Sequence, residues 1–185
     1  MLCATIPVGA LAGARFSTAN PAPVAPSGMI LYHDAHTGFA IAYPPHWSVN
    51  PHFRRDTSPP VHGVSFTVAA ARVTGTNLGA DTKLIVEHVA GPCNAARFLD
   101  APQDLHSETD GARSYSVATE NDAGAGNRYE ETVYALTNGT TCFGIRYFIH
   151  YAAIENFEPG SVKAFDRDAL IATFDRMRRS LAFTD

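Results

Sequence analysis

The chain has 185 residues, a length typical of one domain, and 45% of them are hydrophobic, which is enough to bury a full core. Its 18 acidic residues outnumber its 14 Lys and Arg residues, and the resulting net charge of -4 argues against a nucleic-acid partner. No apolar run reaches the ~18 residues that a membrane-spanning helix needs, so we expect no transmembrane segment.

The first 27 residues differ in composition from the rest of the chain. Residues 2–11 form an apolar stretch, and the small residues of 10–14 fit a signal-peptidase site, although the charged start of a signal peptide is missing. We interpret residues 1–27 as the remnant of a signal peptide, and the alternative is a disordered Ala- and Pro-rich leader. The first interpretation predicts a periplasmic or secreted protein, with residues 28–185 as its single domain.

The first part of the domain has the pattern of strands and turns. Strands are expected over residues 29–34 and 39–43, joined as a hairpin, and two prolines end the second strand. Trp47, the single tryptophan of the chain, follows at once and is expected to cap one end of the core rather than line an aromatic pocket. His46 and a polar, mobile loop over residues 50–63 remain candidates for binding.

The rest of the chain alternates strand-like and helical patterns. Strands are expected over residues 64–73 and 83–89, followed by a short helix capped by Asn94. A three-stranded meander over residues 111–121, 128–137 and 141–153 comes next. The last element is the clearest helix, over residues 161–183, and its apolar stripe must lie on a sheet. The pattern predicts an α+β fold: a twisted antiparallel sheet flanked by helices.

The cysteines and histidines indicate a disulfide rather than a metal site. Cys3 lies in the leader, so Cys93 and Cys142 remain as a pair, and we predict that they form a disulfide. The alternative is two unrelated buried thiols. No cysteine has metal-ligand spacing, and His33 and His36 point to opposite faces of a strand. We expect neither a metal nor a cofactor.

Two segments carry a resemblance to a known family. The stretches "MILYHDAHTGFAIAYPPHW" (29–47) and "AFDRDALIATFDRMRRSLAF" (164–183) are similar to the opening and the end of the PsbP-like family, which includes the photosystem II extrinsic subunit and a Ran-binding import factor. The resemblance implies an α/β/α sandwich around a twisted antiparallel sheet. It also implies a non-catalytic binding, assembly or accessory protein of an exported or lumenal compartment. No family binding residue maps onto this chain.

Arg146 and His150 are the most notable polar pair. They fall on one face of the predicted strand 141–153, where they could hold an anionic ligand. The alternative is a structural Arg146 paired with Glu131 or Glu87, beside a hydrogen-bonded His150. No nucleophile motif or phosphate-binding loop accompanies them, so no catalytic residue is assigned.

The sequence therefore predicts an exported, non-enzymatic accessory or binding protein that contacts a protein partner or a small ligand. The candidate binding residues are Arg146, His150 and His46. One alternative is a small hydrolase built on Arg146 and His150. Another is a periplasmic inhibitor or assembly factor that works through residues 50–63.

Overall fold

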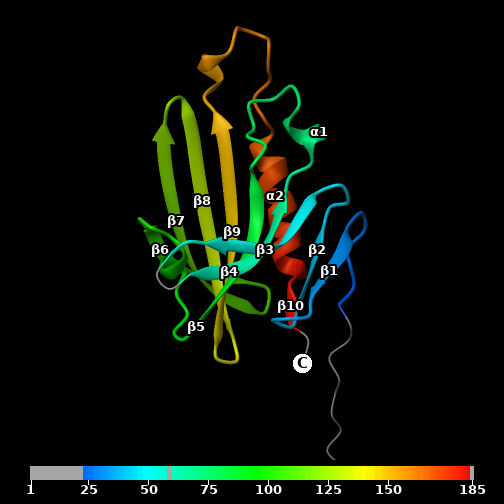
Figure 1. Ribbon diagram of the computed structural model, residues 1–185, viewed down its shortest axis with the longest axis vertical. Helices are drawn as coiled ribbons and strands as arrows, with labels where there is room; N and C mark the ends of the chain where they lie inside the picture. The colour runs from blue at the N-terminus through cyan, green and yellow to red at the C-terminus, as the bar shows by residue number, and fades with distance from the viewer. Residues whose placement is uncertain (1–22, 58–59, 184–185) are drawn as a thin grey trace, which may run out of the picture.

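The computed structural model describes residues 23–57 and 60–183 (Figure 1). The strands are β1 (Ile30–Asp34), β2 (Phe39–Tyr43), β3 (Ser48–Arg55), β4 (Val61–Thr67), β5 (Lys83–Ala90), β6 (Gln103–Asp110), β7 (Arg113–Gly124), β8 (Asn127–Asn138), β9 (Thr141–Ala152) and β10 (Ala182–Phe183). The helices are α1 (Ala70–Val73) and α2 (Arg167–Ser180), with 3-10 turns η1 (Ala95–Phe98) and η2 (Ile154–Asn156). The predicted leader falls mostly on residues 1–22, outside the described residues, and stays a prediction.

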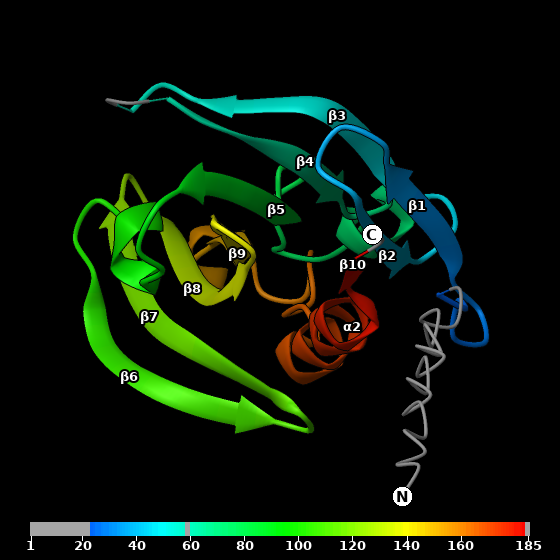
Figure 2. The same ribbon diagram turned by 90° about the horizontal axis from the view of Figure 1, so that it is seen from below.

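The strands form two antiparallel sheets. Seven strands make the large sheet, in the order β3-β4-β5-β9-β8-β7-β6, and three make the small sheet, in the order β1-β2-β10. Figure 2 shows the large sheet curving around α2, with β2 and β10 beside the helix. We call this side of the large sheet its inner face and the opposite side its outer face.

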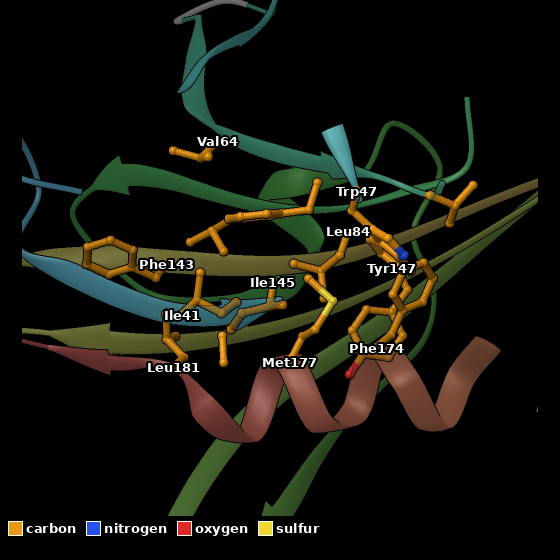
Figure 3. Packing of buried hydrophobic residues seen from close by; sticks show 14 of the residues in the cluster. Ile41, Trp47, Val64, Leu84, Phe143, Ile145, Tyr147, Phe174, Met177 and Leu181 are labelled. Carbon is orange, nitrogen blue, oxygen red and sulfur yellow. The ribbon is translucent and has the colours of Figure 1, made fainter. Parts of the chain in front are cut away.

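The main core fills the inner face. Side chains at alternate positions of β9, from Phe143 to Ile149, pack against α2 and β2 (Figure 3). Trp47 is 6% exposed and meets the ring of Phe174 edge to face, with 5.8 Å between the ring centroids. The prediction that Trp47 caps the core is confirmed, and Tyr43 lies half-buried at the core edge against Phe66.

A smaller core lies on the outer face, beneath η1. Phe98 of this turn is fully buried against Ala135 and Gly144, and the side chain of Asn94 caps the turn by accepting from the Ala96 N–H at 2.8 Å. The disulfide between Cys93 and Cys142 ties the start of η1 to β9, as predicted. The α+β class is confirmed in outline. In the described residues, however, the helical layer on this face is limited to η1, so the expected helices on both faces are present only in part.

The expectation of a mobile loop over residues 50–63 is wrong. Residues 48–55 form β3, and β4 already begins at Val61. Pro51 is tolerated because β3 is an edge strand and because its register with β4 shifts between Asn50 and Phe53. A proline in that bulge removes no hydrogen bond from the sheet.

Two other boundaries differ from the expected ones, and one strand was not expected. The strand expected over 64–73 ends at Thr67, and α1 follows it. The sequence analysis missed β6, because its exposed and charged residues show no apolar alternation. The final helix begins at Arg167 rather than at residue 161, because the Asp166 carboxylate accepts from the Ala169 N–H at 2.9 Å and caps it.

Gly144 marks the closest approach of η1 to the sheet and gives a test of this packing. A Cβ at this position would lie 2.9 Å from the ring of Phe98. We expect Gly144→Ala to lower the free energy of unfolding by about 1–3 kcal/mol, because the added methyl group overpacks a buried site. The measurement is urea unfolding, with Gly124→Ala as the control, since nothing lies within 4 Å of a Cβ there. Equal losses in the two variants would contradict this packing.

Candidate functional site

Arg146 lies in a buried ion-pair cluster on the outer face, formed by Arg55, Glu87, Glu131 and Arg146. Its side chain is 5% exposed, and its Nε donates to Glu87 Oε2 at 3.0 Å. Its terminal nitrogens donate to Glu131 and to the backbone carbonyl of Phe98. Arg55 Nε lies 3.5 Å from the other Glu87 oxygen. Every nitrogen of the Arg146 guanidinium is therefore committed to a protein partner.

The cluster carries two positive and two negative groups, which compensate one another away from water. Burial raises the pKa of Glu87, and Arg146 and Arg55 oppose that change. Burial by itself would lower the pKa of Arg146, but the neighbouring carboxylates outweigh it and raise the pKa. Arg146 thus stays charged as part of the scaffold.

His150 lies on the same face of β9, two strand positions beyond Phe148, and is also engaged. Its Nδ1 lies 2.6 Å from Asp81 Oδ1, and its Nε2 lies 3.0 Å from Asn127 Oδ1. Its ring stacks on Tyr129, with 4.5 Å between centroids. Within the described residues no hydrogen bond joins Arg146 to His150, and neither side chain has a serine or cysteine side chain as a hydrogen-bond partner.

His46, the third candidate, lies apart from both. It follows Pro44 and Pro45 in the turn after β2, is exposed, and adopts a positive φ of 71°. This left-handed backbone redirects the chain so that Trp47 can enter the core. The structure therefore does not bring the three predicted binding residues together.

A different group of side chains does converge, at one rim of the inner face. We call it the histidine cleft. It has a volume of about 720 Å³ and lies where the β1–β2 turn meets β3, β4 and β5. Its polar lining consists mainly of Asp34, His36, His52, Arg54, His62 and His88.

Local structure fixes each wall of the histidine cleft. The Asp34 carboxylate accepts from the backbone N–H groups of His36 at 2.8 Å and Thr37 at 3.1 Å, which holds the β1–β2 turn. On the opposite wall, Asn50 Oδ1 accepts from the His52 N–H at 3.0 Å within the β3 bulge. His62 on β4 and His88 on β5 are direct cross-strand partners.

The charges of the cleft are few at neutral pH. Arg54 pairs with Asp56 at 3.0 Å, and both side chains are exposed. Burial lowers the pKa of His88; Asp34 acts against this, whereas His62 and His36 add to it. Burial and the neighbouring histidines thus disfavour a charged His88, and Asp34 offsets only part of their effect.

Sequence reasoning missed the histidine cleft because its histidines come from four separate segments. One signal was present, since His52 and His62 both belong to the stretch 50–63 that was singled out for binding. Among residues 23–57 and 60–183, no three His, Cys, Asp or Glu side chains are grouped so as to hold a metal ion. No helix in these ranges is long and apolar enough to cross a membrane.

The ion-pair cluster predicts a large stability cost when one partner is neutralised. Glu87→Gln leaves Arg55 and Arg146 short of a buried counter-charge, so we expect the free energy of unfolding to fall by about 3–5 kcal/mol. Asp56→Asn removes the exposed pair with Arg54 and should cost less than about 1 kcal/mol. Urea unfolding at pH 7 compares the two variants. Similar losses of stability would mean that Glu87 carries no charge in the folded protein.

His88 predicts a pH dependence of stability. Its pKa is lowered in the folded protein, so the unfolded chain binds a proton near the ordinary histidine pKa of about 6.5 while the folded protein resists it. The free energy of unfolding should therefore fall as the pH drops through this range, and His88→Gln should reduce the fall. Thermal unfolding between pH 7.5 and pH 5 measures it, with His106→Gln on β6 as the control. An unchanged slope in His88→Gln would refute the assignment.

Comparisons with known proteins add a structural likeness. No family model matches the sequence, and no curated protein matches it. Among solved structures, the chain is similar to the solution structure of the cyanobacterial PsbP (CyanoP) from Synechocystis sp. PCC 6803, with 15% identity and a TM-score of 0.49 over 90% of this chain and 98% of that chain. That protein is a PsbP, as in the family that the two end segments of the sequence resemble. Because the identity is this low, we draw no functional conclusion from the likeness.

Proposed function

We propose that this protein is an exported, non-enzymatic accessory protein and that it binds its ligand in the histidine cleft. The observation that carries the proposal is the cleft itself. Its volume of about 720 Å³ exceeds the 470 and 370 Å³ of two other cavities in the described residues. Ligand sites are commonly concave, about 300–1,000 Å³ in volume, and lined by a few convergent polar groups.

The disulfide supports the exported compartment. Cys93 and Cys142 are 49 residues apart in the sequence, and Cys142 is fully buried. Disulfides persist in oxidising compartments such as the periplasm or the cell exterior. Closing a loop of this length stabilises a fold by about 3–4 kcal/mol in the chain-entropy model. A periplasmic or secreted protein would retain this stabilisation.

The contacts of Arg146 and His150 favour binding over catalysis. A hydrolase would need one of these groups to face substrate with a free donor or acceptor. The guanidinium nitrogens of Arg146 are committed to Glu87, Glu131 and Phe98, and the ring nitrogens of His150 face Asp81 and Asn127. Their positions suit a scaffold that keeps the sheet rigid.

The alternative of an inhibitor or assembly factor acting through residues 50–63 leads to the same surface. Residues 51–54, together with His62 and Gly63, form the β3–β4 wall of the histidine cleft. A partner protein that used this stretch would have to enter or cover the cleft. A test of the cleft therefore bears on both forms of the proposal.

The proposal predicts that filling the cleft abolishes binding. Ala35 is exposed in the β1–β2 turn and lines the cleft, so Ala35→Trp should occupy it without disturbing the core. We expect at least about tenfold weaker binding, or about 1.4 kcal/mol. The control is Ala123→Trp, the same change at an exposed position on β7 outside the cleft.

The measurement is a small-molecule fragment screen by ¹H–¹⁵N NMR at pH 5.5 and pH 7.5. Support requires that the shift changes gather on cleft residues and vanish in Ala35→Trp but not in Ala123→Trp. Fragments that shift only residues elsewhere, or that bind Ala35→Trp unchanged, would overturn the assignment. Hydrolysis of a bound fragment would revive the enzyme alternative.

A further inference from the structure

The composition of the histidine cleft allows its ligand to be defined more closely. Resting on the proposed function, we propose that the cleft binds an organic anion, an oxyanion group on an apolar body, and takes up protons as it does so. Affinity then rises as the pH falls through the range in which histidines titrate. The cleft would load its ligand in mildly acidic surroundings and release it near neutral pH.

The first support is the concentration of histidine. Four of the eight histidines of the chain line this one cleft: His36, His52, His62 and His88. A protonated imidazole donates from both nitrogens and carries a positive charge, which suits a carboxylate, sulfonate or phosphate oxygen. A neutral imidazole offers one donor and no charge, so the attraction depends on pH.

The second support is the shortage of competing negative charge. Among the described residues that line the cleft, Asp34 is the one carboxylate, and its Oδ1 is engaged by two backbone N–H groups of the turn. Arg54 adds a positive charge on β3, paired with the exposed Asp56. Glu87 of β5 lies on the outer face, beyond the sheet.

The titratable and charged groups that face the cleft can be given for each element. The β1 end and the following turn contribute Tyr32, Asp34 and His36; β3 contributes His52 and Arg54; β4 contributes His62; and β5 contributes His88. Burial raises the pKa of Tyr32, so its hydroxyl remains neutral. Between pH 7.5 and pH 5.5 the change in charge inside the cleft therefore comes from the histidines.

Mutual repulsion links the anion to the protons. His62 and His88 are cross-strand partners, so protonating both places two positive charges side by side, one on the exposed His62 and one on the half-buried His88. Burial chiefly lowers the pKa of His88 and His62 adds to the change, so without a counter-ion this protonation is opposed. A bound anion offsets the repulsion and raises the proton affinity of both rings. By linkage, protons then raise the affinity for the anion by the same factor.

The walls explain why the anion should carry an apolar body. Tyr32 contributes aromatic surface to the cleft, and its ring is held edge to face on Phe66 with 5.6 Å between centroids. A volume of about 720 Å³ is also far larger than a bare inorganic ion needs. Apolar contact then contributes a part of the affinity that does not change with pH.

Calorimetric titration with benzenesulfonate, which stays ionised throughout, tests the inference at pH 5.5 and pH 7.5. We expect at least about tenfold tighter binding at pH 5.5, or about 1.4 kcal/mol, with net proton uptake seen as a dependence of the heat on the buffer. Benzyl alcohol is the neutral probe and should bind alike at both pH values. Inorganic phosphate is an oxyanion without an apolar body, so it should bind more weakly than benzenesulfonate.

Variants locate the effect. His62→Gln combined with His88→Gln should about halve the pH dependence for benzenesulfonate, because His36 and His52 remain in the cleft, and should leave benzyl alcohol binding unaffected. The matched control replaces His46 and His106, which lie outside the cleft, and should retain the full pH dependence. If the His62 and His88 double variant does not fold, replacing His36 and His52 serves instead and should about halve the proton uptake.

The outcomes separate this inference from the proposed function. Equal affinity for benzenesulfonate at both pH values would overturn acid-driven anion binding, and so would a loss of the pH dependence in the control variant. The proposed function would still stand in either case if benzyl alcohol binds in the cleft. Failure of both organic probes to shift any cleft resonance would overturn both. Tighter binding of inorganic phosphate than of benzenesulfonate would overturn the inference that the ligand carries an apolar body.

Discussion

The burial of β9 on both of its faces is the constraint on which the rest of the molecule depends. Residues from Phe143 to Ile149 face α2 and the small sheet at alternate positions, while Cys142 and Arg146 face η1 on the other side. A strand buried on both faces cannot slip by one residue, because the slip would bring the charged Arg146 guanidinium into the main core in place of an aromatic ring. The register of its neighbours β5 and β8 follows from β9.

The histidine cleft is a consequence of how the small sheet is attached to this frame. The Ala42 N–H of β2 donates to Ser180 Oγ at the end of α2, at 2.8 Å, and β10 continues from the same helix into the small sheet. The helix thus fixes the position of β2, and the β1–β2 turn then projects over β3, β4 and β5. The cleft is therefore a joint between the small sheet and the large one.

Local patterns explain which features could be predicted from the sequence. The Phe39–Tyr43 strand, the meander, the Cys93–Cys142 pair and the role of Trp47 all depended on alternation, turn residues or cysteine parity within short stretches. Strand β3 was missed because a proline usually ends a strand, and only its edge position and bulge make Pro51 acceptable. The histidine cleft was missed because no local pattern records that His36 and His88, 52 positions apart, end side by side.

The bulge at Pro51 also limits how this molecule can meet another chain. An open edge strand normally invites a foreign strand to extend the sheet through backbone hydrogen bonds. At β3 the shift in register between Asn50 and Phe53 and the missing amide of Pro51 interrupt that row of donors, close to the mouth of the cleft. Recognition at this rim must then proceed through side chains, which favours a compact guest over an extended peptide and opposes the pairing of a neighbouring copy through β3.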